Sequence, residues 1–158
     1  IQEIIVYMKI YNFFNKIRQG DIDSVKKDLI NSPDLISEKD ERGSSPLILS
    51  CYLDKINITK LLLEFGSDIN ELDLMGNSAL IGVSFKGNLE IVKLLVDNKA
   101  KLDIQNNSGS TALIYSAMYK NKDVYNFLII SGANKELKDK KGKTALDYAK
   151  ENGLLNDF

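Results

Sequence analysis

The chain has 158 residues, of which 44% are hydrophobic and 27% are charged, and its formal net charge is −1 at pH 7. This length is enough for one domain with a continuous core, and the near-neutral charge provides no overall field that would recruit nucleic acid or an anionic membrane. Histidine is absent and Cys51 is the single cysteine, which excludes histidine-based acid–base catalysis, a Ser-His-Asp triad, nearly all zinc sites and an intrachain disulfide.

The N-terminal residues show neither a secretory signal nor a membrane helix. Residues 1–7 precede the first methionine, Met8, and the chain starts at Ile1, so we expect an N-terminus that is processed or incomplete. Whether residues 1–7 are native stays open. No apolar run approaches the roughly 18 residues that a membrane helix needs. With one cysteine and no signal, we expect a cytoplasmic, reducing environment and no membrane partner.

The segment GDIDSVKKDLI, residues 20–30, has the pattern of a helix that recurs as the second helix of each unit later in the chain. The loop that follows it carries one extra residue compared with those units, and it contains Pro33. We therefore expect residues 8–39 to form a divergent N-terminal cap unit.

From residue 40 onward the sequence repeats with a period of 33 residues. Each unit begins with Asp or Asn, two variable residues and a glycine, a pattern typical of a tight turn in which glycine takes a positive φ. Ser or Thr follows as a helix cap, and Pro46 occupies a first helical position, where its missing N–H costs nothing. The aligned columns are Asp40, Asp73, Asn106 and Asp139; Gly43, Gly76, Gly109 and Gly142; Ser45, Ser78, Thr111 and Thr144; and Leu47, Leu80, Leu113 and Leu146. They predict units at residues 40–72, 73–105, 106–138 and 139–158.

A second helix is expected in each complete unit, as in NLEIVKLLVDN, residues 88–98, whose apolar residues cover one side. Gly66 and Gly132 stand where a left-handed residue would end two of these helices. Lys99 occupies that position in the third unit, and we expect it to fray or reshape the helix end. The last unit, which ends in ENGLLNDF, is too short for a full second helix and is expected to be a partial C-terminal cap.

The tripeptide Gly142-Lys143-Thr144 raises the alternative of a phosphate-binding loop. Such a loop needs another glycine five residues before Gly142, and Leu137 stands there instead. The tripeptide therefore fits a hairpin glycine followed by a helix cap, and we expect no nucleotide and no other cofactor.

The repeated pattern Asp-x-x-Gly-x-Ser/Thr-Pro/Ala-Leu, followed by a second apolar helix, resembles the ankyrin repeat over residues 40–158. The resemblance implies an all-α solenoid of about five units, the first and last atypical, in a single domain over residues 1–158. It also implies a non-enzymatic role in binding a protein partner through the concave face, formed by the hairpin tips and first helices. The family usually has a histidine after the leucine, where this chain has Ile48, Ile81, Ile114 and Asp147. We therefore expect cohesion between units to depend more on apolar packing.

Large side chains stand at positions that the family leaves variable, through three successive units. Several exposed apolar and aromatic residues together commonly mark an interface. The alternative is that some of these side chains pack between adjacent units. The candidate partner-binding residues are Arg42, Tyr52, Leu53, Leu74, Met75, Phe85, Lys86, Asn107, Met118 and Tyr119. If Phe85 lies on an exposed docking surface, Phe85→Ala should cost less than about 1 kcal/mol of stability. If Phe85 wedges between units, the cost should be about 3–5 kcal/mol.

Other sites are weaker candidates. The lysines between residues 135 and 143 are interrupted by Glu136 and Asp139 without interleaved aromatic residues, so they indicate a solvated terminal unit rather than a nucleic-acid patch. Cys51 stands where the family prefers alanine and is expected to be a small buried core residue. We expect a monomer that binds a protein. The alternative function is a targeting or regulatory segment of a larger enzyme or effector.

Overall fold

The computed structural model describes residues 1–155, and every regular element within that range is helical. The expected all-α repeat architecture is confirmed. The helices are α1 (Gln2–Gln19), α2 (Ile22–Asn31), the 3₁₀-helix η1 (Pro33–Ser37), α3 (Pro46–Tyr52), α4 (Ile56–Glu64), α5 (Ala79–Lys86), α6 (Leu89–Asp97), α7 (Ala112–Met118), α8 (Lys122–Ile130) and α9 (Ala145–Glu151).

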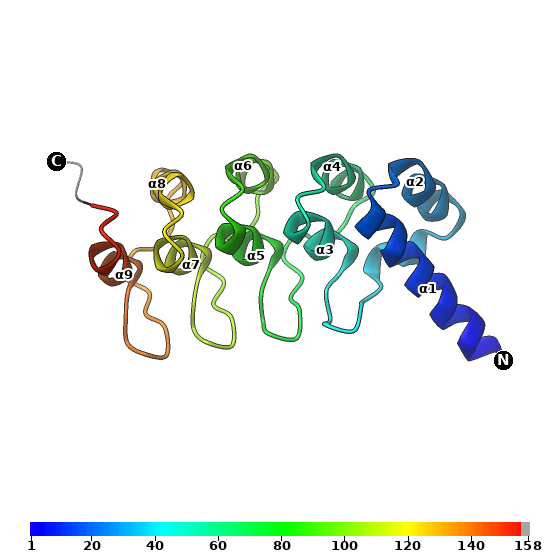
Figure 1. The fold of residues 1–158 in the computed structure, drawn as a ribbon, viewed down its shortest axis with the longest axis horizontal. Coiled ribbons are helices and arrows are strands. Elements are labelled where there is room, and N and C mark those ends of the chain that lie inside the picture. Colours follow the sequence, from blue (N-terminus) through cyan, green and yellow to red (C-terminus); the bar gives the residue numbers. More distant parts are fainter. Residues whose placement is uncertain (156–158) are drawn as a thin grey trace.

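The helices form an elongated stack of two parallel rows (Figure 1). The inner row contains α3, α5, α7 and α9, and the outer row contains α2, α4, α6 and α8. The hairpin loops project from the inner row on the side away from the outer helices. Each unit packs mainly on its sequence neighbours, as expected for a solenoid.

The hairpins and caps form where the period of 33 residues predicts them. Gly43, Gly76, Gly109 and Gly142 have φ between 71° and 77°. The hydroxyl groups of Ser45, Ser78, Thr111 and Thr144 each accept a hydrogen bond from the backbone N–H three residues later. A side chain at Gly76 would also meet the backbone N of Asn107 at 3.0 Å, so glycine is required there by both its φ and the close approach of the next hairpin.

Neighbouring hairpins are joined by backbone hydrogen bonds. The N–H of Leu74 donates to the carbonyl of Arg42 at 3.1 Å, and the N–H of Asn107 donates to the carbonyl of Met75 at 3.0 Å. The N–H of Lys140 continues the series by donating to Ser108 at 3.0 Å. These bonds fix the spacing of the hairpin tips, which form one side of the groove described below.

A continuous apolar core runs along the stack between the two rows of helices. The leucine that follows each cap is buried in the first three units after residue 40, at Leu47, Leu80 and Leu113. The outer helices contribute Leu62, Leu95 and Leu128, which are also buried. Cys51 lies in this core with 0% of its surface exposed, as the sequence predicts.

The expectation that Lys99 reshapes the end of α6 is wrong. Lys99 adopts the left-handed conformation itself, with φ of 68°. Its N–H donates to Val96 at 2.9 Å, and the N–H of Ala100 donates to Leu95 at 3.0 Å. The helix end that contains Gly66 has the same two bonds. The surrounding hydrogen bonds therefore impose the conformation even where a side chain makes it unfavourable.

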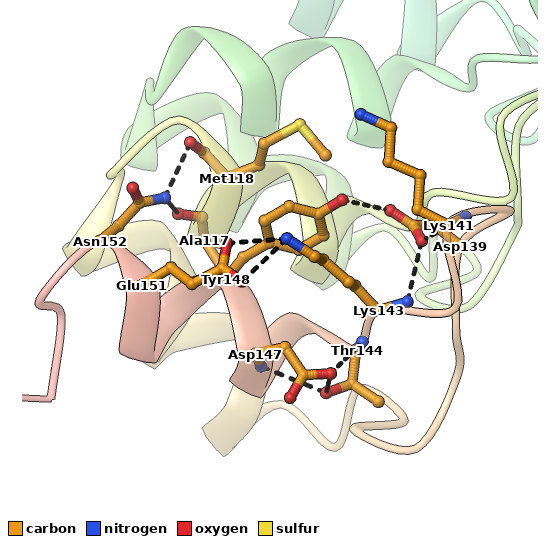
Figure 2. A network of polar contacts seen from close by, with 10 residues as sticks. All are labelled: Ala117, Met118, Asp139, Lys141, Lys143, Thr144, Asp147, Tyr148, Glu151 and Asn152. Atoms are coloured by element: carbon orange, nitrogen blue, oxygen red, sulfur yellow. Dashed lines mark hydrogen bonds and ion pairs between the residues drawn. The ribbon is translucent and has the colours of Figure 1, made fainter.

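Cohesion between units does not depend on apolar packing alone, because asparagine side chains provide polar links. The Asn106 amide donates to the Asn77 side chain at 2.8 Å. The Asn121 amide donates to the carbonyls of Ser84 and Phe85. The Asn152 amide makes the equivalent bonds to two carbonyls of α7 (Figure 2). The units of this chain, which has no histidine, are thus joined by asparagine hydrogen bonds in addition to apolar packing.

The cap unit starts with a helix longer than those of the other units. α1 begins at Gln2, before the expected start of this unit at residue 8, so residues 2–7 continue the helix that buries Phe13, Phe14 and Ile17. Its N-terminal half extends past the stack (Figure 1), and its large apolar side chains there are exposed. Within residues 1–155, no helix combines the length and apolar character needed to cross a membrane.

Candidate binding groove

A groove of about 960 Å³ lies between the hairpin tips and the inner helices of the second to fourth units. Residues of the two hairpins that begin at Asp40 and Asp73 form one wall. Side chains of α3, α5 and α7 form the floor and the other wall. Arg18, in the last turn of α1, also lines the groove.

The groove exists because one inner helix lacks a side chain at its centre. Leu49, Gly82, Tyr115 and Tyr148 occupy equivalent positions in four successive units, each 33 residues apart. A Cβ atom added to Gly82 would meet no atom within 4 Å. The space that a leucine or tyrosine side chain fills in the neighbouring units is therefore open over α5.

Four aromatic side chains form a ladder beside this opening, and we call Tyr52, Phe85, Tyr115 and Tyr119 the aromatic ladder. The Tyr52 and Phe85 rings are nearly parallel, with centroids 6.5 Å apart. Phe85 meets Tyr119 edge to face at 4.5 Å, and Tyr115 packs edge to face on both. Rings in these geometries attract one another beyond their area burial, so the ladder forms a preorganised apolar surface along three units.

Cationic groups border the aromatic surface. The Lys86 ammonium lies 5.1 Å from the centre of the Tyr52 ring, a favourable cation–π geometry. The Arg18 guanidinium lies 3.8 Å from the Asp40 carboxylate, and Arg42 is exposed at the adjacent hairpin tip. Both arginines of the chain therefore line the groove.

Most of the candidate residues lie around this groove. Those that line it are Arg42, Tyr52, Leu53, Leu74, Met75, Phe85 and Tyr119. Leu74 and Met75 are 71% and 61% exposed at their hairpin tip. Lys86 is outside the lining and instead covers the Tyr52 ring.

Two of the candidate residues are partly covered by their neighbours, and a third makes a hydrogen bond between two hairpins. Phe85 is half-buried among the other rings of the ladder, and Met118 is half-buried against the core. These two side chains therefore lie between the two alternatives, because each packs on its neighbours and keeps part of its surface exposed. Asn107 is exposed, but its amide donates to the carbonyl of Leu74 at 3.0 Å, so it holds two hairpins together.

The groove also includes residues that sequence reasoning missed, notably Gly82, Tyr115 and Arg18. Gly82 and Tyr115 stand in the same repeat column, which could have indicated a missing side chain beside a large one. Arg18 could have been found only by aligning the cap unit across its extra residue.

The described residues contain neither a cluster of metal-ligating side chains nor a cysteine thiol with a lowered pKa. Within residues 1–155, no three or more Asp, Glu, His or Cys side chains gather as a metal site would require. Burial raises the pKa of the Cys51 thiol to about 12, so the thiolate needed for nucleophilic attack is scarce at neutral pH. The arrangement can bind through apolar contact, cation–π contact and hydrogen bonds.

Comparison with known proteins agrees with this architecture. A family model described as ankyrin repeats (3 copies) matches residues 13–106 and again residues 81–157. The chain is 38% identical over 50 residues to the DNA-binding protein RFXANK of Homo sapiens, covering 32% of this chain and 19% of that protein. It is 42% identical over 50 residues to the Acyl-CoA-binding domain-containing protein 6 homolog of Dictyostelium discoideum, covering 32% and 17%. The aligned region thus spans about a fifth of the length of either relative.

Proposed function

This chain belongs to the ankyrin-repeat family, and on that premise we propose that it binds a protein partner in the groove over Gly82. Repeats of this family generally mediate interaction between proteins. The aromatic ladder would provide the apolar contact, and Arg42 and Lys86 at the border would orient the partner. The protein would act as a non-enzymatic scaffold, as a monomer in the cytoplasm.

The observation that carries the proposal is the combination of an open groove with exposed apolar side chains on its rim. Monomeric proteins rarely leave a large contiguous apolar surface uncovered, and such surfaces commonly mark binding sites. Leu74, Met75, Tyr52 and Tyr119 are all exposed along the groove. Aromatic residues, methionine and arginine are also the types enriched at protein interfaces.

Gly82→Phe tests the proposal, because it fills the groove without removing any existing contact. The added ring enters open space on a helix, so the fold should be retained. We expect proteins captured from a lysate by the wild-type domain to be depleted by about tenfold or more with this variant.

The matched control is Glu90→Phe, which adds the same side chain at an exposed position of the outer helix α6. It should capture the same proteins as the wild type. Equal capture by all three versions would show that the groove is not the binding surface.

A second candidate function is a targeting or regulatory part of a larger enzyme or effector. It is favoured by the names of the two relatives, one of which is called DNA-binding and the other acyl-CoA-binding. Each relative is also much longer than the aligned 50 residues. The full-length reading frame distinguishes the two candidates, because a further domain would support the second. Nucleic acid is not proposed as a partner, since the aromatic ladder is bordered by few cations and the C-terminal lysines are interrupted by acidic residues.

A further inference from the structure

Two successive units place a tyrosine ring against the first polar residue of their own hairpin. In the last unit, the hydroxyl of Tyr148 donates to the Asp139 carboxylate at 2.5 Å (Figure 2). In the unit before it, the Asn106 amide donates to the hydroxyl oxygen of Tyr115 at 2.9 Å. Asn106 and Asp139 are buried, with 7% and 8% of their surfaces exposed.

The third unit has the same hairpin residue but no ring. Asp73 is equivalent to Asn106 and Asp139, and Gly82 is equivalent to Tyr115 and Tyr148. The Oδ1 atom of Asp73 accepts the two backbone N–H bonds of the turn, as Asp139 does. Its Oδ2 atom takes a long contact of 3.4 Å from the Asn77 amide. Asp73 is half-buried rather than buried, which agrees with the lack of a covering ring.

The second unit has a leucine at the position equivalent to Gly82 and an arginine near its hairpin aspartate. Leu49 provides an apolar side chain, and the Oδ2 atom of Asp40 faces the Arg18 guanidinium at 3.8 Å. Among these four units, the third is therefore the one that combines an open ring position with a carboxylate in the groove lining. Leu49, Phe85 and Tyr115 line the same groove as Gly82.

We propose that the protein partner anchors itself with a tyrosine side chain, whose ring lies over Gly82 and whose hydroxyl donates to Oδ2 of Asp73. This inference rests on the proposed function and specifies the chemistry of the partner. The partner's side chain would complete in the third unit the contact that Tyr148 makes within its own unit (Figure 2). The rings of the aromatic ladder would pack around it edge to face.

The Tyr148–Asp139 contact within the last unit indicates that a tyrosine hydroxyl stays protonated beside an ionised aspartate in this arrangement. Burial, followed by the bond to Asp139, raises the pKa of Tyr148 to about 12, so its hydroxyl remains a donor at neutral pH. Burial raises the pKa of Asp139, but the hydrogen bonds from Tyr148, Lys143 and Lys141 outweigh this effect, so its pKa lies below the ordinary value and it remains an acceptor. A phenol donating to a carboxylate is a charge-assisted bond, so tyrosine should be preferred over phenylalanine.

Substitution at Gly82 tests the geometry without a partner. Gly82→Tyr should make the bond to Asp73 internally, whereas Gly82→Phe adds the ring without the hydroxyl. We expect the tyrosine variant to have the higher melting temperature of the two, with Gly82→Ala as the reference for the helix alone. A tyrosine variant no more stable than the phenylalanine variant would contradict the proposed position of the hydroxyl.

Binding of amino-acid probes tests the recognition directly. N-acetyl-tyrosinamide and N-acetyl-phenylalaninamide are titrated into the wild-type domain while backbone amide shifts are recorded. We expect saturable shifts at Gly82, Asp73 and Tyr115, with the tyrosine probe binding at least about fivefold more tightly. Gly82→Tyr should abolish these shifts because its own ring occupies the position.

Asp73→Asn is the matched control for the acceptor. Asn106 makes the same two backbone bonds in the next unit, so the hairpin should be retained, while the charged acceptor is lost. The preference for the tyrosine probe should then fall. The inference would be overturned if neither probe shifted these amides or if the two probes bound equally tightly. It would also be overturned if Asp73→Asn kept the full preference for the tyrosine probe. The proposed function would survive any of these results if Gly82→Phe still prevents capture of the partner.

Discussion

At the residue scale, Phe85 links the stability of the stack to the proposed binding surface. The sequence leaves two alternatives for this residue, a fully exposed docking side chain or a wedge between units. The structure places Phe85 between them, since it is half-buried and contacts the rings of Tyr52, Tyr115 and Tyr119. Its contacts cross from one unit to the next, so it serves both packing and the surface of the groove.

Phe85→Ala should therefore lower the free energy of unfolding by about 1.5–3 kcal/mol, because aromatic pairs contribute about 0.5–1.5 kcal/mol each beyond area burial. A urea melt measures the loss. Phe65→Ala, at the end of α4 and outside the ladder, is the control and should cost less than about 1 kcal/mol. Equal losses for the two variants would show that the ring contacts of Phe85 contribute nothing specific.

The Tyr148–Asp139 bond gives the last unit a stability that depends on pH. Because the pKa of Asp139 lies below its ordinary value of 3.8, its contribution is complete above pH 3.8 and is lost as the pH falls through the lowered pKa. Because the pKa of Tyr148 is raised from 10.0 to about 12, its contribution is complete below pH 10 and is lost toward pH 12. The bond is therefore fully effective between these limits.

Tyr148→Phe removes this bond and should lower the stability at pH 7 by about 1.5–3 kcal/mol, as for a hydrogen bond to a charged group. The difference from the wild type should shrink when the melts are repeated below the pKa of Asp139. A difference that stays constant down to that pH would mean that the carboxylate is not the partner that matters.

At the element scale, the ends of the outer helices show how local strain is tolerated. Gly66, Lys99 and Gly132 occupy equivalent positions and all adopt positive φ. A residue with a side chain pays about 1–2 kcal/mol for this conformation, and glycine avoids that cost but loses more backbone entropy on folding. Lys99 is therefore under backbone strain that Gly66 and Gly132 avoid at the equivalent positions.

Lys99→Gly should raise the free energy of unfolding by up to about 1 kcal/mol, the net of relieved strain and added entropy cost. Thermal or urea melts measure this change. Lys99→Ala is the matched control, because it removes the charge and the long side chain but keeps the strain, and it should show no gain. A gain of the same size in both variants would assign the effect to the lysine side chain instead of the backbone.

The repeated elements could be predicted from the sequence because their residues act locally. Asp73, Gly76 and Ser78 each have a conformational role within a few residues, and the period repeats that role in each unit. The groove could not be predicted in the same way, because it results from what Gly82 lacks relative to the side chains of neighbouring units. The conformation of Lys99 was also missed, since hydrogen bonds of the surrounding fold override its local preference.

At the scale of the whole molecule, the stack is stabilised by nearest-neighbour contacts, so its two ends should differ from its middle. At the C-terminal end, α9 packs on α7, and Leu146 is 41% exposed. In the units before it, the equivalent leucines are buried by neighbours on both sides. The last unit therefore has fewer stabilising contacts than the third.

Hydrogen exchange should show that the C-terminal unit, residues 144–158, opens before the third unit, residues 78–97. The last three residues of this range, 156–158, lie outside the described part of the chain, so the comparison depends on residues 144–155. Their amides should exchange at lower free energies than those of α5 and α6. Equal protection in the two ranges would contradict a stack whose stability decreases toward this end.

We propose that the groove over Gly82 is the surface that binds the partner. Mapping a captured partner on the domain by backbone amide shifts and exchange protection tests this claim most directly. We predict that the changes cluster in residues 40–53, 73–87 and 115–119, while the outer helices α4, α6 and α8 stay unchanged. Changes centred on the outer helices, or on the exposed N-terminal half of α1, would contradict the claim.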